Sequence, residues 1–156
     1  MEVDEHEMPG LVRKVSGGMI RALAALLVLF PVTVQAADVS GAVTHVRDGD
    51  TIEVEGIAVR LQGVSAPERG HALYDKGKAF MARLVMGQAV RCELDGTRTH
   101  DRVVGICYLD GRDIGAEVIR AGLALDCPRF SKGRYRDYET PGARQAIKLP
   151  AYCRPR

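Results

Sequence analysis

Five short runs of alternating apolar and polar residues, separated by turn sequences, constrain the fold of this chain most strongly. The runs cover residues 39–46, 51–54, 57–61, 88–94 and 103–109. Alternation with a period of two is typical of strands that bury one face. Glu55-Gly56 and Asp110-Gly111 are turn sequences at the ends of these runs. The pattern therefore predicts a small protein built mainly of strands around one core.

Two segments have helical spacing instead. Between Ala72 and Met86 apolar residues recur at intervals of three and four, and Gly87 is a typical helix end. Asp113 can cap a second, shorter helix that ends at Gly122. Three strands, a helix, two strands and a helix predict a mainly β, α+β fold. We expect a five-stranded barrel of the OB type with two to three packed helices.

The chain length allows one domain, and the first 37 residues are predicted to lie outside it. The chain has 156 residues, of which 46% are hydrophobic, enough for a single core. Basic residues precede an apolar run from Ala22 to Val34 and a small-residue site that ends at Ala36, as in a signal peptide. The run is shorter than the roughly 20 residues of a membrane span. We expect cleavage, a periplasmic or secreted protein and no stable membrane association afterwards; an uncleaved anchor is the alternative.

Charge is unevenly distributed in the rest of the chain. Residues 38–128 carry a net charge of −3, whereas residues 129–156 carry +6. We therefore divide the mature chain into an OB-type domain at 38–130 and a basic C-terminal extension of the same domain at 131–156. Such an extension can follow a phosphate backbone, or it can simply be solvated. Tyr135 and Tyr138 in this extension could stack on bases or cover the end of the barrel, and the sequence does not decide between the two.

Four cysteines, at positions 92, 107, 127 and 153, point to disulfides. An even number of cysteines in an exported chain favours two bonds, with three possible pairings. Cys92 and Cys107 lie on strands predicted to be consecutive, which favours Cys92–Cys107 and Cys127–Cys153. Four buried free thiols are the alternative. The spacing of cysteine and histidine does not match a structural zinc site.

Two motifs carry the residues for chemistry. Asp48-Gly49-Asp50-Thr51 places two carboxylates at the junction of two predicted strands, and Arg60 and Glu68 lie on and just after the next strand. A carboxylate can hold a cation or activate water, and a guanidinium group matches a phosphate. Each residue alone has an ordinary explanation as a turn or a solvated side chain. Together at one rim of a barrel they provide what hydrolysis of a phosphodiester requires.

These motifs, in this order, resemble the thermonuclease (staphylococcal nuclease-like) family, in particular its exported bacterial members. The later Asp110-Gly111 and Ala121-Gly122-Leu123-Ala124 extend the resemblance, which runs from about Val43 to Phe130. The resemblance implies an OB barrel with three helices. It also implies hydrolysis of phosphodiester bonds in DNA or RNA with one calcium ion as cofactor.

The resemblance also implies a role for each residue of the two motifs. Asp50 would be the metal-binding carboxylate, and Asp48 would support the turn. Glu68 would orient the attacking water as a base, and Arg60 would hold the phosphate. Ser65 stands where the family usually has a second metal-binding aspartate. A site with one carboxylate fewer should bind calcium more weakly.

The second arginine of the family depends on the alignment. Counting back without gaps from Asp110-Gly111 places Arg102 at that position. The residues before it differ from the Asp-Lys/Arg-Tyr-Gly that the family usually has, and His100 stands where the family often has a phosphate-binding tyrosine. In an alternative alignment Asp101-Arg102 begins that signature and the catalytic arginine is deleted. We expect Arg102 to bind the phosphate.

Two functions are therefore considered. The first is a secreted or periplasmic, metal-dependent nuclease acting on DNA or RNA. The second is a catalytically weakened OB module that binds nucleic acid or a protein partner, and Ser65 favours it. Asp50, Arg60 and Glu68 favour the nuclease, since a binding module has no evident need for all three. The sequence gives no sign of an obligate protein partner or an organic cofactor.

Overall fold

The computed structural model describes residues 38–155, so the predicted signal peptide lies outside the described residues. The strands are β1 (Asp38–Val46), β2 (Thr51–Val54), β3 (Ile57–Leu61), β4 (Val64–Ser65), β5 (Ala89–Thr99), β6 (Arg102–Leu109), β7 (Arg112–Asp113) and β8 (Leu125–Asp126). The α-helices are α1 (Tyr74–Val85), α2 (Ile114–Arg120), α3 (Pro128–Ser131) and α4 (Ala143–Ala146). Two 3-10 helices complete the described elements, η1 (Arg136–Tyr138) and η2 (Ala151–Cys153).

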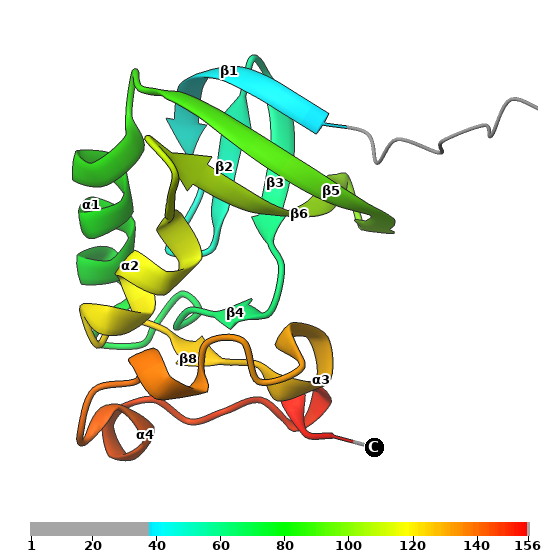
Figure 1. The fold of residues 1–156 in the computed structure, drawn as a ribbon. Coiled ribbons are helices and arrows are strands. Elements are labelled where there is room, and N and C mark those ends of the chain that lie inside the picture. The colour runs from blue at the N-terminus through cyan, green and yellow to red at the C-terminus, as the bar shows by residue number, and fades with distance from the viewer. Residues whose placement is uncertain (1–37, 156) are drawn as a thin grey trace, which may run out of the picture. The chain divides into compact units, whose positions relative to one another are not determined.

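Five of the strands form a closed ring. Hydrogen bonds join them in the order β3-β2-β1-β5-β6, and β3 also pairs with β6 (Figure 1). The closing pair is parallel, with Arg60 opposite Val104, while the other pairs in the ring are antiparallel. The α+β fold with a five-stranded OB barrel, predicted from the alternating runs, is confirmed.

Alternate residues of the ring fill the core, and two helices cover it. Met81 and Val85 of α1 and Ile114 and Val118 of α2 are fully buried against the strands. Asp113 caps α2, since its Oδ1 accepts from the backbone N–H groups of the residues two and three positions later, at 2.9 and 3.2 Å. The strand residues of this core are Val43, Val46, Ile52, Val54, Val59, Leu61, Val90 and Leu109.

The structure differs from the sequence prediction in three places. Strand β5 continues past Leu94 to Thr99, across an irregularity in its pairing with β6. A second, two-stranded sheet joins β4 to β8, with Ser65 opposite Leu125. The residues from Pro128 onward, for which the sequence pattern predicted no particular element, contain the four short helices α3, η1, α4 and η2. Two of these are α-helices, so the described chain has more helices than the two to three expected.

Both predicted disulfides are confirmed. Cys92 and Cys107 are directly opposite on β5 and β6, and Cys127–Cys153 joins the residue before α3 to η2. Among the described helices, none is long and apolar enough to cross a membrane.

Candidate active site

The turn between β1 and β2 packs directly on the loop after β4. Within the turn, the N–H of Asp50 donates to Asp48 Oδ1 at 3.0 Å. A Cβ atom on Gly49 would lie 2.9 Å from the Cβ of Ala66, closer than side chains normally approach. Glycine at this position therefore lets the first motif lie against the second, and brings Asp50 to the segment that leads to Glu68.

Asp50 is buried and fully engaged. It is 3% exposed, and its Oδ2 accepts from the N–H of Ala66 at 3.0 Å. Its Oδ1 accepts from the guanidinium of Arg60 and from the hydroxyl of Thr51 at 3.1 Å. Burial raises the pKa of Asp50 to about 6, and the nearby Asp48 adds to this rise while Arg60 opposes it. Asp50 therefore organises the centre of the site through three neighbouring groups.

Arg60 leads from this buried centre toward the surface. Its side chain is 16% exposed, and it also donates to the backbone oxygen of Val64 at 3.3 Å. Burial works against its positive charge, but the adjacent Asp50 and then Tyr152 raise the pKa of Arg60 above its usual value. The structure thus brings two predicted site residues together as an ion pair, a contact that the sequence prediction did not contain.

Arg102 is connected to the same centre. It begins β6 and donates to the hydroxyl of Thr51 at 3.2 Å and to the oxygen of Thr99 at 3.4 Å. Because Thr51 in turn donates to Asp50, hydrogen bonds run from Arg102 through Thr51 and Asp50 to Arg60. The ungapped alignment is therefore compatible with the geometry, since it places a second guanidinium beside the first.

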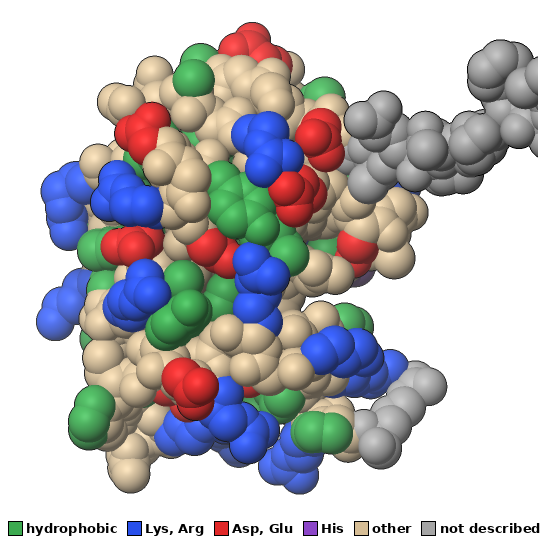
Figure 2. All heavy atoms as spheres, in the orientation of Figure 1, with side chains coloured by type: hydrophobic (Ala, Val, Ile, Leu, Met, Phe, Trp, Pro, Cys, Tyr) green, Lys and Arg blue, Asp and Glu red, His purple; other side chains and the backbone are tan. Residues whose placement is uncertain are grey.

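Three of the four predicted residues line one groove. Its volume is about 640 Å³, within the roughly 300–1,000 Å³ of ligand sites. Figure 2 shows the surface hollowed between the barrel and the half that contains α3. Arg60, Glu68 and Arg102 line the groove, and Asp50 lies behind it. The other lining residues are Leu61, Gln62, Gly63, Val64, Asp95, Thr97, Arg98, Thr99, His100, Val104, Cys127, Phe130 and Tyr152.

Glu68 lies at the edge where this groove meets a smaller depression. Its side chain is exposed and also lines that depression, whose volume is about 430 Å³, together with Asp48. A carboxylate in this position is accessible to water and close to the groove that holds both arginines. Its position and exposure are compatible with the role of a base that the sequence predicts.

The residues around Asp50 offer few protein ligands for a cation. The described residues contain no group of three or more His, Cys, Asp or Glu side chains arranged to hold a metal. Asp50 and Asp48 offer carboxylate oxygens, which are ligands of Ca²⁺ and Mg²⁺, but both oxygens of Asp50 already accept hydrogen bonds. A cation there would take most of its ligands from phosphate oxygens and water.

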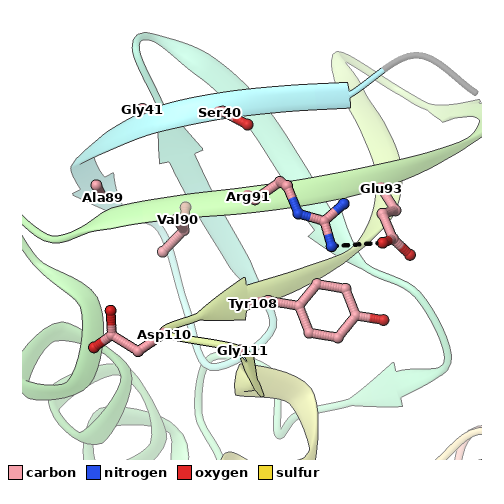
Figure 3. A pocket seen from close by; sticks show the side chains of 9 residues that line it. All are labelled: Ser40, Gly41, Ala89, Val90, Arg91, Glu93, Tyr108, Asp110 and Gly111. Carbon is pink, nitrogen blue, oxygen red and sulfur yellow. Dashed lines mark ion pairs between the residues drawn. The ribbon is translucent and has the colours of Figure 1, made fainter.

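A second groove, on the outside of the barrel, lacks these features. Its volume is about 550 Å³, and it lies over β1, β5 and β6 (Figure 3). The guanidinium of Arg91 is engaged there by Glu93 at 2.7 Å and lies 5.4 Å from the centre of the Tyr108 ring. Asp110 contributes another carboxylate to the same groove. Because this groove contains one guanidinium and two carboxylates, it is a poorer candidate for phosphate binding than the main groove.

The sequence analysis did not predict the two aromatic residues of the main groove, and it left open whether Tyr135 and Tyr138 stack on bases. Phe130 and Tyr152 line the groove, and each is 47% exposed. Tyr135 is 1% exposed, so it covers the core and cannot stack on a base. Tyr138 lies under Arg120, whose guanidinium is 4.0 Å from the ring centre. The one sequence signal for Tyr152 is its position directly before a disulfide cysteine.

The chain combines a closed five-stranded barrel with one groove lined by two arginines and an exposed glutamate. The family of staphylococcal nuclease homologues matches residues 58–145, and the chain belongs to this family. The match contains Arg60, Glu68 and Arg102, whereas Asp50 precedes it.

Three relatives show how far the similarity extends. The succinoglycan biosynthesis protein ExoI of Rhizobium meliloti (strain 1021) is 37% identical over 102 residues, which are 58% of this chain and 53% of that protein. The micrococcal nuclease of Shigella flexneri is 29% identical over 146 residues, or 83% and 84% of the two chains. An uncharacterized endonuclease of Escherichia coli is 32% identical over 111 residues, or 68% and 72%. The chain thus spans about half of the length of ExoI and most of the length of the other two.

Proposed function

We propose that this protein is a metal-dependent nuclease that hydrolyses phosphodiester bonds in DNA or RNA. The observation that carries the proposal is the placement of Arg60, Glu68 and Arg102 in one groove, beside the buried Asp50. Membership of the family, and relatives named as a micrococcal nuclease and an endonuclease, support nuclease activity in general.

In this proposal the two arginines bind the scissile phosphate. Arg60 is held by Asp50 and Val64, and Arg102 by Thr51 and Thr99, so both guanidinium groups are oriented before substrate arrives. Guanidinium groups form strong, directional hydrogen bonds with phosphate oxygens. Charge that gathers on those oxygens during attack is stabilised most by groups that need no reorganisation.

Glu68 acts as the base. A water molecule at the groove edge gives a proton to the Glu68 carboxylate while its oxygen forms a bond to phosphorus. The bond from phosphorus to one sugar oxygen breaks, and that oxygen takes a proton from solvent. The exposure of Glu68 suits this role, since the side chain must reach water and pass the proton on.

Asp50, supported by Asp48, would hold the divalent cation, which we propose to be calcium. A bound cation supplies neutralisation of phosphate charge. Because Ser65 brings a hydroxyl instead of a carboxylate, and is 2% exposed, we expect the free protein to bind the cation weakly. Substrate phosphate then completes the site.

The proposal includes export to the periplasm or medium. Residues 1–37 have the pattern of a signal peptide, and two disulfides are typical of proteins from oxidising compartments. Export would place the enzyme where extracellular nucleic acid is its substrate.

A noncatalytic binding module remains the second candidate because of two specific observations. Ser65 stands where the family usually has a carboxylate, and both oxygens of the remaining Asp50 already accept hydrogen bonds, from Arg60, Thr51 and Ala66. Such a module would use the same arginines to bind nucleic acid and would not cleave it.

Cleavage of single-stranded DNA and RNA by oxidised protein comprising residues 38–156 separates the two candidates. The nuclease requires fragments that appear with millimolar calcium, disappear with chelator and return when calcium is added in excess. Binding without cleavage in calcium, manganese and magnesium would contradict the nuclease and favour the binding module.

A further inference from the structure

Two exposed aromatic side chains face the groove that holds the proposed phosphate-binding arginines. Phe130 on α3 and Tyr152 on η2 are each 47% exposed, and both line the groove with Arg60 and Arg102. Exposed rings beside cationic groups are typical of proteins that bind single strands, because every unpaired base can stack on a ring.

Tyr152 lines the groove together with Arg60 and acts on its charge. Its phenol raises the pKa of Arg60 above the usual value. The phenol therefore lies close to the guanidinium proposed to bind the scissile phosphate. A nucleotide bound through its phosphate at Arg60 would occupy the same groove as this ring.

The position of Tyr152 depends on one disulfide. The backbone hydrogen bonds of the described residues 148–155 outside helices are local, from Cys153 to Pro150 and from Arg154 to Ala151. Cys153, the residue after Tyr152, is fully buried and bonded to Cys127. The bond is therefore a covalent connection between the segment that carries Tyr152 and the residue before α3, and Leu149 adds a hydrophobic contact with Leu125, Ala143 and Ile147.

The other end of that bond is firmly held. The N–H of Cys127 donates to the oxygen of Gly63 at 2.8 Å, in the turn that joins β3 to β4. Gly63 has a positive φ of +72°, and a Cβ there would lie 2.5 Å from the Cβ of Ser131, so α3 lies directly on this turn. The start of α3 is thus fixed to the end of the strand that carries Arg60. The disulfide holds Cys153, and with it the neighbouring Tyr152, next to this fixed point.

We propose that Tyr152 stacks on an unpaired base of the substrate strand, and that the Cys127–Cys153 bond is part of the binding site because it holds this ring at the groove. The inference rests on the proposed function, since the occupant is the single-stranded nucleic acid that the groove would cleave. It adds a particular stacking residue and a dependence of substrate binding on the oxidised state of one bond.

Binding of a fluorescein-labelled single-stranded DNA, measured by anisotropy in chelator so that nothing is cleaved, tests the ring. Tyr152→Ala should raise the Kd by roughly 5- to 150-fold, the range for loss of one base–aromatic stack. Tyr152→Phe, which keeps the ring, should stay within about 2-fold of the unchanged protein. Tyr138→Ala is the matched control, since Tyr138 is an exposed tyrosine that does not line the groove.

The same oligonucleotide with abasic positions separates stacking from a structural effect. The abasic strand should bind the unchanged protein with about the same Kd as the normal strand binds Tyr152→Ala. The Kd of the abasic strand should not rise further when Tyr152→Ala replaces the unchanged protein. An equal loss on both strands would contradict stacking, as would normal binding of the normal strand by Tyr152→Ala.

The disulfide is tested by replacing each bond in turn with serines. Cys127→Ser/Cys153→Ser should lose the same factor in affinity as Tyr152→Ala, and combining the changes should add nothing. Cys92→Ser/Cys107→Ser, folded by circular dichroism, should bind normally. Normal binding by the Cys127→Ser/Cys153→Ser protein would overturn the role of the bond.

These outcomes are distinct from those for the nuclease. Protein that cleaves DNA but binds it equally well with and without Tyr152 contradicts this inference alone. Protein that binds through Tyr152 but never cleaves contradicts the nuclease alone. Folded protein that binds no single strand contradicts the stacking role directly.

Discussion

Arg60 on β3 donates a hydrogen bond to the carboxylate of Asp50, ten residues earlier in the chain, and both side chains are largely buried. Each group therefore compensates the charge of the other in a place where water cannot. The ion pair stabilises the rim of the barrel and also orients the guanidinium of Arg60 for phosphate binding. The same Asp50 carboxylate lies at the proposed cation site.

Removing Asp50 alone should destabilise the protein strongly. Asp50→Ala leaves the buried guanidinium of Arg60 without a partner, which typically costs about 3–5 kcal/mol. Asp50→Ala/Arg60→Met should recover a large part of this loss, because it removes the orphaned charge. Urea unfolding of the single and double variants measures the difference.

An exposed ion pair provides the control for this experiment. Asp101 bonds to Arg47 at 2.6 Å, but its side chain is 65% exposed. Asp101→Ala should shift the unfolding midpoint far less than Asp50→Ala, because water compensates an exposed charge. Equal shifts for the two variants would show that the buried Asp50–Arg60 pair contributes no more to stability than the exposed pair.

Arg102 and the nearby Arg98 should differ in their effect on cleavage. Both line the groove, but only Arg102 is joined through Thr51 to Asp50. Arg102→Ala should lower kcat by about 10²-fold or more, as expected for loss of one oriented group on a charged transition state. Arg98→Ala should mainly raise KM. Single-turnover and steady-state rates test the assignment. An unchanged kcat in Arg102→Ala would favour the alternative alignment, in which the catalytic arginine is deleted.

Loss of the Cys92–Cys107 bond should reduce stability without changing substrate binding. The bond joins β5 and β6 across the barrel wall and closes a loop with a sequence separation of 15. Chain entropy alone predicts a loss of about 3 kcal/mol for Cys92→Ser/Cys107→Ser. Denaturant unfolding of protein with and without the bond measures it. An unchanged midpoint would mean that the five-stranded ring restrains these strands without the bond.

Tyr135 should make the protein sensitive to alkali. Its hydroxyl lies 3.1 Å from Asp113 Oδ2, and burial together with this carboxylate raises the pKa of Tyr135 above its usual value. The folded state therefore keeps the proton more tightly than the unfolded state. Stability from Tyr135 is fully present below the usual tyrosine pKa of about 10 and is lost as pH rises above it.

The expected alkaline loss is measured as the change in unfolding free energy between pH 8 and pH 11. Tyr135→Phe should show a smaller change than the unchanged protein, although the loss of a hydrogen bond lowers its stability at pH 8 by about 1 kcal/mol. Tyr138→Phe, at an exposed ring, serves as control and should keep the full alkaline change. An identical pH dependence in all three proteins would contradict the role of Tyr135.

The features that the sequence predicts correctly have a local physical cause. Alternation located β1, β2, β3 and β6 because each buries one face, and Asp113 was recognised as a cap because a carboxylate meets the free N–H groups of the next turn. The pairing of Cys92 with Cys107 followed from their predicted places on neighbouring strands.

The features that the sequence does not predict depend on contacts between distant residues. The β4–β8 pair is two residues long on each side, so it has no period, and its partners are about sixty positions apart. Asp50 and Arg60 were assigned separate ligands, and only the barrel shows that they also bind each other. Tyr152 lies in a short segment without periodicity, and a disulfide brings it to the groove.

The cleavage rate of a single-stranded DNA by Glu68→Gln, in calcium, tests the central claim most directly. Glu117→Gln is the control, because Glu117 lies on α2 in an ion pair with Arg120 and outside the groove. The account predicts calcium-dependent cleavage by the unchanged protein and by Glu117→Gln, and a loss of at least about 10²-fold with Glu68→Gln, which should still bind the strand. Equal cleavage by Glu68→Gln and the unchanged protein would contradict the account, and so would no cleavage by any of the three folded proteins.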